Sequence, residues 1–192
     1  MHTRGFWRER FHWYRLWIFE RRSTPVADPL PAPSDVSLRR LDRHQRRDWV
    51  TQRTADRDWP QYRVALENDH ELILAERGGE VLGWAWIGYG RVFLAPLGRA
   101  IRLSDGTGYL YDAYVRPAER GRGIGRALVA ARVARAEARG TVRLLSHVRI
   151  GNAVSRRALE HEGFSIIGET VFMRALALCL WTREPLPAPR AA

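Results

Sequence analysis

Apolar and polar residues alternate with a period of two in many short segments of this chain, and follow a helical period in a few longer ones. The alternating segments are bounded by glycine, proline or charged residues. They predict strands over residues 36–41, 71–76, 80–87, 109–115, 142–148, 164–167 and 171–180. The helical segments predict helices over residues 42–53, 124–139 and 152–162, the first with Asp42 as its N-cap. Elements in this order predict a mixed α/β domain with one central sheet.

Two features refine this outline in the middle of the chain. The turn at residues 77–79 contains two glycines and predicts a hairpin between the strands that flank it. Trp84 and Trp86 lie two positions apart on the second of these strands, so they face one side of the sheet, where aromatic residues are usually core. Residues 89–107 are glycine-rich around a short apolar stretch, which predicts a long loop or an additional hairpin.

The first 22 residues differ from the rest because they mix aromatic side chains with arginines. One face of a helical wheel would collect Trp7, Phe11, Tyr14 and Ile18. Residues 16–20 fit the start of a strand equally well, so the type of element stays open. A proline-rich stretch follows, in which helix is disfavoured and a semi-extended linker is expected. The expected divisions are an N-terminal segment at 1–22, a linker at 23–34, the domain at 35–181 and a proline- and alanine-rich tail at 182–192.

Three interpretations of residues 1–22 are open. Tryptophan mixed with arginine suits peripheral contact with an anionic membrane surface. Arginines on phosphates and aromatic rings on bases would suit RNA. Packing of the aromatic face on the domain or on a partner subunit is the interpretation we favour, because amphipathic segments usually bury their apolar face on their own protein.

Composition narrows the class of protein. The chain has 192 residues, 45% of them hydrophobic, which suits one globular domain with modest extensions. The formal net charge is +11, and every basic side chain is arginine because the sequence contains no lysine. A Walker A site, a pyridoxal Schiff base and a biotinyl-lysine all need a lysine amine and are excluded. Arginine in place of lysine throughout is typical of a genome-wide bias, so nucleic-acid binding is a minor hypothesis.

The single cysteine, Cys179, can form neither an internal disulfide nor a structural zinc site, and we expect no metal. No apolar run approaches the roughly 18 residues of a membrane-spanning helix. Arg8, Arg10 and Arg15 interrupt any stretch that could act as a secretory signal. We therefore expect a cytoplasmic protein.

A glycine-rich turn separates the predicted strand over 109–115 from the helix that begins near Ile124. Its glycines do not have the spacing of the dinucleotide-binding motif G-x-G-x-x-G. A strand, a turn of bare amides and a helix N-terminus nevertheless make an anion site suited to a pyrophosphate. Arg120, Arg122 and Arg126 add positive charge around such a site.

In this region the chain resembles the GCN5-related N-acetyltransferases (GNAT). The run Val115-Arg-Pro-Ala-Glu-Arg120-Gly-Arg-Gly123-Ile-Gly125 matches that family's Val-x-Pro-x-x-(Arg/Gln)-x-x-Gly-x-(Gly/Ala) without gaps. Downstream, Asn152 through Gly163-Phe164 is similar to the family's Asn…Gly-Phe helix. The resemblance implies the GNAT fold, a mixed central sheet of about six or seven strands flanked by helices and splayed between its fourth and fifth strands.

The resemblance also implies a place for acetyl-CoA, in the V-shaped gap between the strands that end near Val115 and Val148. Backbone groups of Ala113, Tyr114 and Val115 would pair with the pantetheine arm, and one amide there would polarise the thioester carbonyl. Asn152 would contact the pantetheine, cap the following helix, or do both. The pyrophosphate would be held by Arg120, Gly121, Arg122, Gly123, Ile124, Gly125 and Arg126.

The resemblance also implies candidate catalytic groups, and each of them has an alternative. In this family a tyrosine usually acts as the acid that protonates the leaving CoA thiolate, and this chain has Leu159 at that position. A water or Tyr114 would then protonate the thiolate, or the thiolate would leave unprotonated. His147 stands where members acting on protein N-termini have a glutamate, and a histidine can take a proton near neutral pH. A histidine that is merely hydrogen-bonded is an equal alternative. Asp112 matches an aspartate of some small-amine acetyltransferases, although we favour a structural hydrogen bond for it.

The sequence thus predicts an N-acetyltransferase that moves an acetyl group from acetyl-CoA directly to a primary amine of a small molecule or peptide, within a ternary complex. The alternative is a non-catalytic acyl-CoA-binding module that docks to a membrane or RNA through residues 1–22. A homodimer through the C-terminal strands is common in the family and is expected.

Overall fold

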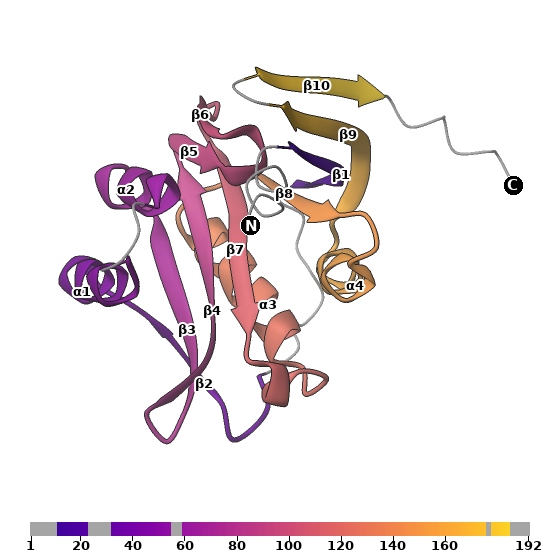
Figure 1. Ribbon diagram of the computed structural model, residues 1–192. Helices are drawn as coiled ribbons and strands as arrows, with labels where there is room; N and C mark the ends of the chain where they lie inside the picture. The colour runs from indigo at the N-terminus through magenta and orange to yellow at the C-terminus, as the bar shows by residue number, and fades with distance from the viewer. Residues whose placement is uncertain (1–10, 23–31, 55–58, 176–177, 185–192) are drawn as a thin grey trace, which may run out of the picture.

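The computed structural model describes residues 11–22, 32–54, 59–175 and 178–184. Its strands are β1 (Phe11–Arg22), β2 (Ser37–Arg40), β3 (Glu71–Arg77), β4 (Glu80–Tyr89), β5 (Arg91–Leu94), β6 (Arg99–Arg102), β7 (Thr107–Val115), β8 (Arg143–Arg149), β9 (Ser165–Ala175) and β10 (Leu178–Glu184). Its α-helices are α1 (Arg43–Thr54), α2 (Pro60–Glu67), α3 (Ile124–Ala138) and α4 (Ala153–His161). Within these residues, eight strands form one sheet in the order β10-β9-β1-β8-β7-β4-β3-β2, and β5 pairs with β6 in a separate hairpin (Figure 1).

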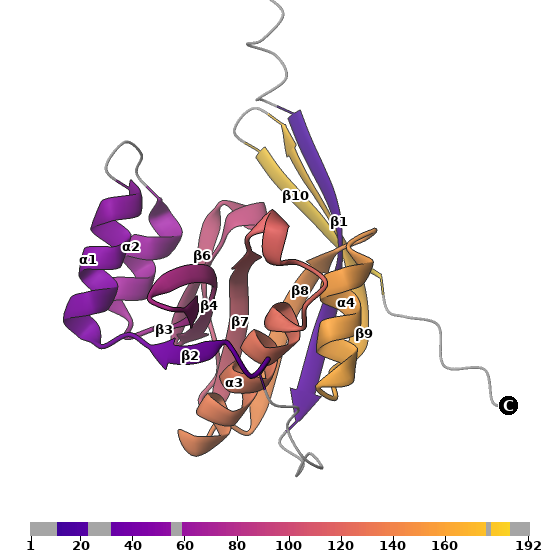
Figure 2. The same ribbon diagram turned by 90° about the horizontal axis from the view of Figure 1, so that it is seen from below.

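Helices cover both faces of this sheet. α3 and α4 pack on one face, over a core that includes Leu110 of β7 and Leu144 of β8. α1 and α2 pack on the opposite face, over a second core around Leu72 and Trp86. The two pairs of helices stand apart in Figure 2, with the sheet between them. Each face is covered because its strands present apolar residues on both sides, as in the mixed α/β class predicted from the sequence.

Local signals explain where the first two helices begin. The backbone N–H of Gln45 donates to the carboxylate of Asp42 at 2.9 Å, and the N–H of Asp42 donates to the side-chain oxygen of Gln45 at 3.2 Å. This reciprocal pair is a capping box, so the predicted N-cap is confirmed. α2 was not predicted. It opens with Pro60, which is tolerated in the first turn because no acceptor there needs its missing N–H.

The first strand in the sequence lies inside the sheet. β1 pairs antiparallel with β8, from Leu16 opposite Arg149 to Arg22 opposite Arg143, and with β9 along its other edge. Phe19 is fully buried in the core under α3 and α4. The expected boundary, which set residues 1–22 apart from the domain, is corrected here for residues 11–22. They form an extra strand, so the sheet has one strand more than the expected six or seven.

The last strands also differ from expectation. β9 continues as one strand through Gly168, which is buried and pairs with Ile18 beside a shift in register, whereas the sequence predicted a break near this glycine. β9 ends at Ala175 and β10 begins at Leu178, and residues 176–177 lie outside the described residues. β10 continues to Glu184, so its last residues come from the segment predicted as a tail. Residues 89–107 contain the β5–β6 hairpin with a 3₁₀ turn at Ala95–Leu97, which confirms one of the two alternatives.

Candidate active site

β7 and β8 are parallel neighbours that separate after a short paired stretch. Their ladder runs from Thr107 opposite Arg143 to Leu110 opposite Ser146, and it stops there although both strands continue. The hydroxyl of Ser146 donates to the carbonyl oxygen of Leu110 at 2.9 Å, which fixes the last pair. Beyond this pair the two strands diverge, as their arrows show in Figure 1. The predicted splay between the fourth and fifth strands of the fold is therefore confirmed, and we call this gap the V.

β7 carries a bulge inside the V. Asp112 and Ala113 together oppose the single residue Ala85 of β4. Asp112 has φ 44°, in the left-handed region that residues other than glycine rarely adopt. Just beyond the bulge the strands approach so closely that a Cβ on Gly83 would lie 2.5 Å from the carbonyl oxygen of Tyr114. A bulge takes backbone groups out of the ladder, so it leaves main-chain hydrogen-bonding groups beside the V for a ligand.

The carboxylate of Asp112 points toward α2. The phenol of Tyr62 donates to it at 2.8 Å, and the indole of Trp84 lies close by without making a hydrogen bond. Burial raises the pKa of this carboxyl, and the hydrogen bond from Tyr62 opposes the rise. On the α3 side, burial lowers the pKa of Arg132 to about 10, and the charge of Asp112 opposes that change. These contacts agree with the structural hydrogen bond favoured for Asp112.

Tyr114 follows the bulge and stacks on Trp84. Their ring centroids are 4.4 Å apart and their planes differ by 26°. Trp84 and Trp86 both pack into the core under α1 and α2, where Trp86 is fully buried. The prediction that these two tryptophans are core residues is confirmed.

The glycine-rich turn lies at the open end of the V, between β7 and α3. Gly121 and Gly123 have φ +80° and +82°, which other residues adopt only with strain. Gly123 is the N-cap of α3, offers no side-chain cap, and is followed by no acidic residue in the first turn. The amides of the first helical turn from Ile124 thus lack both an intrahelical acceptor and a side-chain acceptor. They form the positive end of a helix dipole, as the anion-site prediction requires.

The arginines of the turn take three different orientations. Arg120 donates from Nε to the carbonyl oxygen of Val115 at 3.1 Å, so it folds back on the end of β7. Arg122 is 59% exposed and lies 3.3 Å from Glu119. Arg126 faces Glu162, with 3.9 Å between Nε and the carboxylate. The Nε and one Nη of Arg126 are buried without a hydrogen-bond partner in the part of the chain that the structure describes.

Asn152 begins α4 at the other side of the V. Its side-chain oxygen accepts a hydrogen bond from the backbone N–H of Ser155 at 3.1 Å. The N-cap role is therefore confirmed, and Asn152 remains exposed, so contact with a pantetheine arm stays a prediction.

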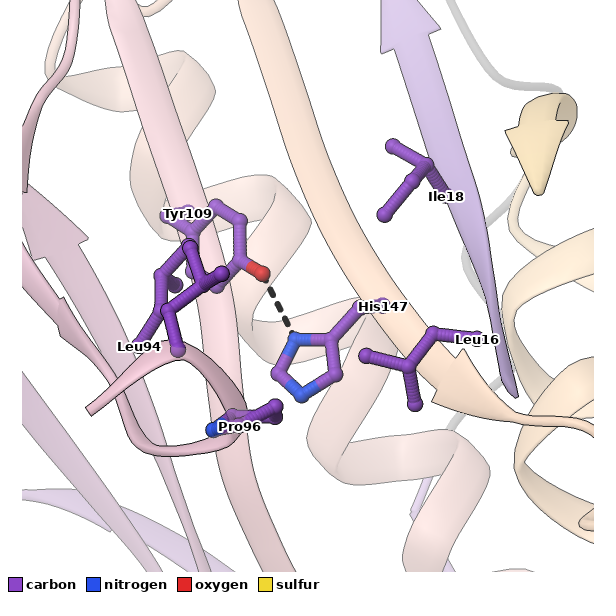
Figure 3. Close-up of a pocket in the computed structure, with 7 residues that line it drawn as sticks. Leu16, Ile18, Leu94, Pro96, Tyr109 and His147 are labelled. Atoms are coloured by element: carbon purple, nitrogen blue, oxygen red, sulfur yellow. Dashed lines mark hydrogen bonds between the residues drawn. The ribbon is translucent and has the colours of Figure 1, made fainter. Parts of the chain in front are cut away.

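His147 is the first residue of β8 beyond the last pair with β7. Its Nδ1 lies 2.6 Å from the phenol oxygen of Tyr109, the dashed contact in Figure 3. Burial lowers the pKa of His147 to about 4, so the ring is neutral at physiological pH. The structure thus places His147 in a hydrogen bond at the closed end of the V, and Asp112 at the bulge in β7. No described hydrogen bond or ion pair joins the two.

Leu159 is buried in the α3–α4 core, so α4 offers no acid at the position where the family usually has one. Two other residues of this region escaped sequence reasoning. Tyr62 was missed because α2 itself was missed. Arg132 sits in an arginine-rich helix, where nothing in the sequence separates this buried residue from its half-buried neighbours.

None of the helices that the structure describes combines the length and apolar character needed to cross a membrane. No group of His, Cys, Asp or Glu side chains among the described residues is arranged to hold a metal ion.

The splayed sheet with helices on both faces is the GNAT fold. The acetyltransferase (GNAT) family matches residues 37–164, most of the chain, and this protein therefore belongs to that family. β1 precedes the matched range and β10 follows it. No curated protein matches the chain.

Solved structures share the fold at low sequence identity. A Drosophila protein is 15% identical with a TM-score of 0.57, covering 86% of this chain and 52% of its own. A GCN5-related N-acetyltransferase from Sphaerobacter thermophilus is 14% identical with a TM-score of 0.57, covering 92% and 54%. The chain thus spans about half the length of these two proteins. The aminoglycoside N-acetyltransferase AAC(6')-Iy, solved with CoA-S-monomethyl-acetylneamine, is 18% identical with a TM-score of 0.51, covering 69% and 92%.

Proposed function

We propose that this protein is an N-acetyltransferase that transfers an acetyl group from acetyl-CoA to a primary amine by direct transfer within a ternary complex. The observation that carries the proposal is the V between β7 and β8 with the uncapped amides of α3 at its open end. Family membership and the CoA-type ligand of the aminoglycoside N-acetyltransferase support it. The acceptor class is a small-molecule or peptide amine.

The residues around the V fit acetyl-CoA. Gly121 and Gly123 leave the amides of the turn open to a pyrophosphate, and the exposed Arg122 adds positive charge to this turn. Beyond Leu110, β7 has no ladder partner on its β8 side, so we assign the backbone groups of Ala113, Tyr114 and Val115 on that side to the pantetheine arm. When bound, acetyl-CoA supplies the activated acyl group.

Two groups of this chain serve the transfer itself. A backbone N–H of the bulge donates to the thioester carbonyl oxygen and stabilises the negative charge that develops there. His147 accepts the proton of the amine, directly or through a water. This role needs the tautomer with hydrogen on Nδ1, which then donates to Tyr109, because Nε2 is then free to accept a proton.

Protonation of the leaving thiolate has no obvious donor on α4, because Leu159 is an apolar core residue. Tyr114 lies on β7, the strand that bounds the V, and it is our candidate for the acid, with water as the alternative. Loss of activity in Tyr114→Phe, with acetyl-CoA binding unchanged, is the expected signature of this role.

Calorimetric titration with acetyl-CoA tests the cofactor site. We expect saturable binding by the wild-type protein and none by Gly123→Glu, which places a carboxylate where the phosphates would lie. Gly140→Glu is the matched control, because Gly140 also has positive φ (+79°) and lies at the opposite end of α3. Absence of binding by folded wild-type protein at millimolar ligand would overturn the proposal.

An amine panel tests the transfer. Release of free thiol together with an acetylated product supports the enzyme, whereas tight binding without transfer to any amine supports a non-catalytic acyl-CoA-binding module. Docking of such a module to a membrane or RNA through residues 1–22 is less well supported, because both edges of β1 pair with neighbouring strands in the sheet. Residues 1–10, which complete the proposed membrane or RNA segment, lie outside the described residues. The homodimer and the cytoplasmic location stay predictions.

A further inference from the structure

A small pocket opens beside His147 at the closed end of the V. It lies on the sheet face opposite α3 and α4, and Figure 3 shows the side chains that converge on it. Four segments of the chain contribute: β1, β5 with the 3₁₀ turn that follows it, β7 and β8. The lining residues are Leu16, Ile18, Leu94, Pro96, Leu97, Tyr109 and His147.

The lining favours an uncharged, apolar occupant. Leucine, isoleucine and proline side chains make up most of it, and it includes no carboxylate and no guanidinium. The imidazole of His147 is neutral because burial lowers its pKa to about 4. An alkylammonium group would lose its hydration here without gaining an opposite charge. The pocket therefore suits hydrocarbon rather than a protonated amine.

The position of the pocket relates it to the donor. The ladder of β7 and β8 ends at Leu110 and Ser146, and Tyr109 and His147 directly flank this last pair. The glycine-rich turn follows β7 at the other end of the V. Five residues separate Leu110 from Val115, or about 17 Å at roughly 3.3 Å per residue. A thioester whose phosphates lie at the turn therefore points its acyl end toward the pocket.

We propose that this pocket receives the end of the transferred acyl group. The preferred acyl group is then propionyl or butyryl, which is one or two carbons longer than acetyl. The inference rests on the proposed function and names the donor more closely. The cavity measures about 20 Å³, whereas one water-sized group needs roughly 10–15 Å³. There is space for one or two carbons beyond acetyl and none for a long chain.

β1 sets the length limit in this arrangement. Leu16 and Ile18 form one wall, and both come from the strand that precedes the family match. Ile18 is only partly buried and pairs with His147 across the sheet, so a larger side chain at this position would project into the same space. The acyl preference is thus a property that the family motif alone does not carry.

The test is a calorimetric series on the full-length protein with CoA and its acetyl, propionyl, butyryl and hexanoyl thioesters. Each added methylene that enters the pocket should tighten binding about fourfold. We expect affinity to rise from acetyl to propionyl or butyryl and to fall at hexanoyl. Ile18→Phe should remove this rise while leaving the affinity for CoA itself unchanged.

A matched control separates filling of the pocket from general disturbance. Ile166→Phe makes the same substitution in the neighbouring strand β9, at a partly buried isoleucine that packs against the opposite core. It should keep the wild-type series. Ile18→Ala is a second variant that enlarges the pocket, and it should move the best binder toward hexanoyl.

The outcomes distinguish this inference from the function on which it rests. If folded protein binds neither CoA nor any thioester, the proposed function fails and the pocket assignment fails with it. If CoA and all thioesters bind equally, the donor site stands and the acyl pocket is overturned. If Ile18→Phe instead weakens only the binding of an amine acceptor, the pocket belongs to the acceptor and the inference is wrong.

Discussion

His147 and Asp112 stand on the two strands that separate at the V, and their surroundings give them different chemistry. Asp112 is held by the phenol of Tyr62, and its carboxyl pKa is raised by burial. One ring nitrogen of His147 is engaged with Tyr109, and no described contact occupies the other. A carboxylate that already accepts a strong hydrogen bond is suited to holding α2 against the bulge. The neutral imidazole of His147 has a nitrogen free to accept a proton, and its pKa of about 4 makes it a weaker base than the ordinary histidine expected from the sequence.

Replacement of His147 by alanine tests its role. We expect kcat/KM to fall about 100-fold, the usual scale for loss of a general base, and the acidic limb of the pH profile to change. His161→Ala, at an exposed histidine of α4, is the control and should leave both unchanged. An unaltered kcat/KM in His147→Ala would remove this residue from the mechanism.

A second buried histidine, His70, has a structural role, because its ring nitrogens form hydrogen bonds to neighbouring strands. Its Nε2 lies 2.9 Å from the carbonyl oxygen of Arg91 and 3.2 Å from that of Tyr89, so this nitrogen carries the hydrogen. Its Nδ1 then accepts from the hydroxyl of Tyr111 at 2.7 Å. These bonds tie the start of β3 to the β4–β5 connection. Burial lowers the pKa of His70 to about 4.

The protein should therefore lose stability as the pH falls from 6.5, the ordinary histidine pKa, toward 4. In this window the unfolded chain binds protons that folded His70 and His147 do not, so each of the two histidines lowers the free energy of unfolding by up to about 1.4 kcal/mol per pH unit. Urea unfolding at pH 7, 6 and 5 measures the slope. His70→Gln should be less stable at pH 7 and show a shallower slope, whereas His44→Gln, at an exposed position of α1, should keep the wild-type slope. A slope that His70→Gln leaves unchanged would contradict the assignment.

Among the elements, those with an internal signal were predicted well. The strand before the glycine-rich turn, the turn itself and α3 all carry local patterns, so the elements on this side of the V were predicted from the sequence. The bulge at Asp112 has no such pattern, because it depends on how β4 and β7 pair. β1 was uncertain because its aromatic residues fit a helix or a strand equally well. Only the pairing of β1 with β8 and β9 makes this segment a strand. Pairing between segments that are distant in the sequence cannot be recognised from local periodicity.

Gly83 of β4 gives a prediction for the bulge. A methyl group at this position would meet the backbone carbonyl of Tyr114, which cannot rotate away as a side chain can. We expect Gly83→Ala to displace the end of β7 and to weaken acetyl-CoA binding roughly tenfold or more, in line with overpacking strain of about 1–3 kcal/mol. Gly78→Ala, in the β3–β4 turn with nothing within 4 Å, is the control and should bind as the wild type does. Equal binding by both variants would show that the bulge does not position the donor.

At the scale of the whole molecule, β1 joins the two halves of the sheet. β8 pairs with it on one side and β9 on the other, so its loss would separate β9 and β10 from the rest. It also fills the α3–α4 core with Phe19, and removal of such a side chain alone costs about 3–5 kcal/mol. A domain's entire stability is only about 5–15 kcal/mol.

A chain lacking residues 1–22 should therefore fail to fold rather than merely lose a peripheral contact. Thermal unfolding monitored by circular dichroism measures this, and we expect no cooperative transition. A chain lacking only residues 1–10 keeps β1 and is the control, for which we expect a clear transition. A stable, acetyl-CoA-binding protein without residues 1–22 would show that the sheet can close without β1.

The central place of the first strand has a consequence for synthesis in the cell. β1 is the first part of the domain to leave the ribosome, yet one of its two partners, β9, ends only at Ala175. At about 5–20 residues per second, the nascent chain carries this aromatic strand for roughly ten to thirty seconds before both partners exist. Throughout that interval its apolar side chains are available to chaperones or to aggregation. The yield of this protein should therefore respond to the rate of translation and to the supply of chaperones more strongly than its size suggests.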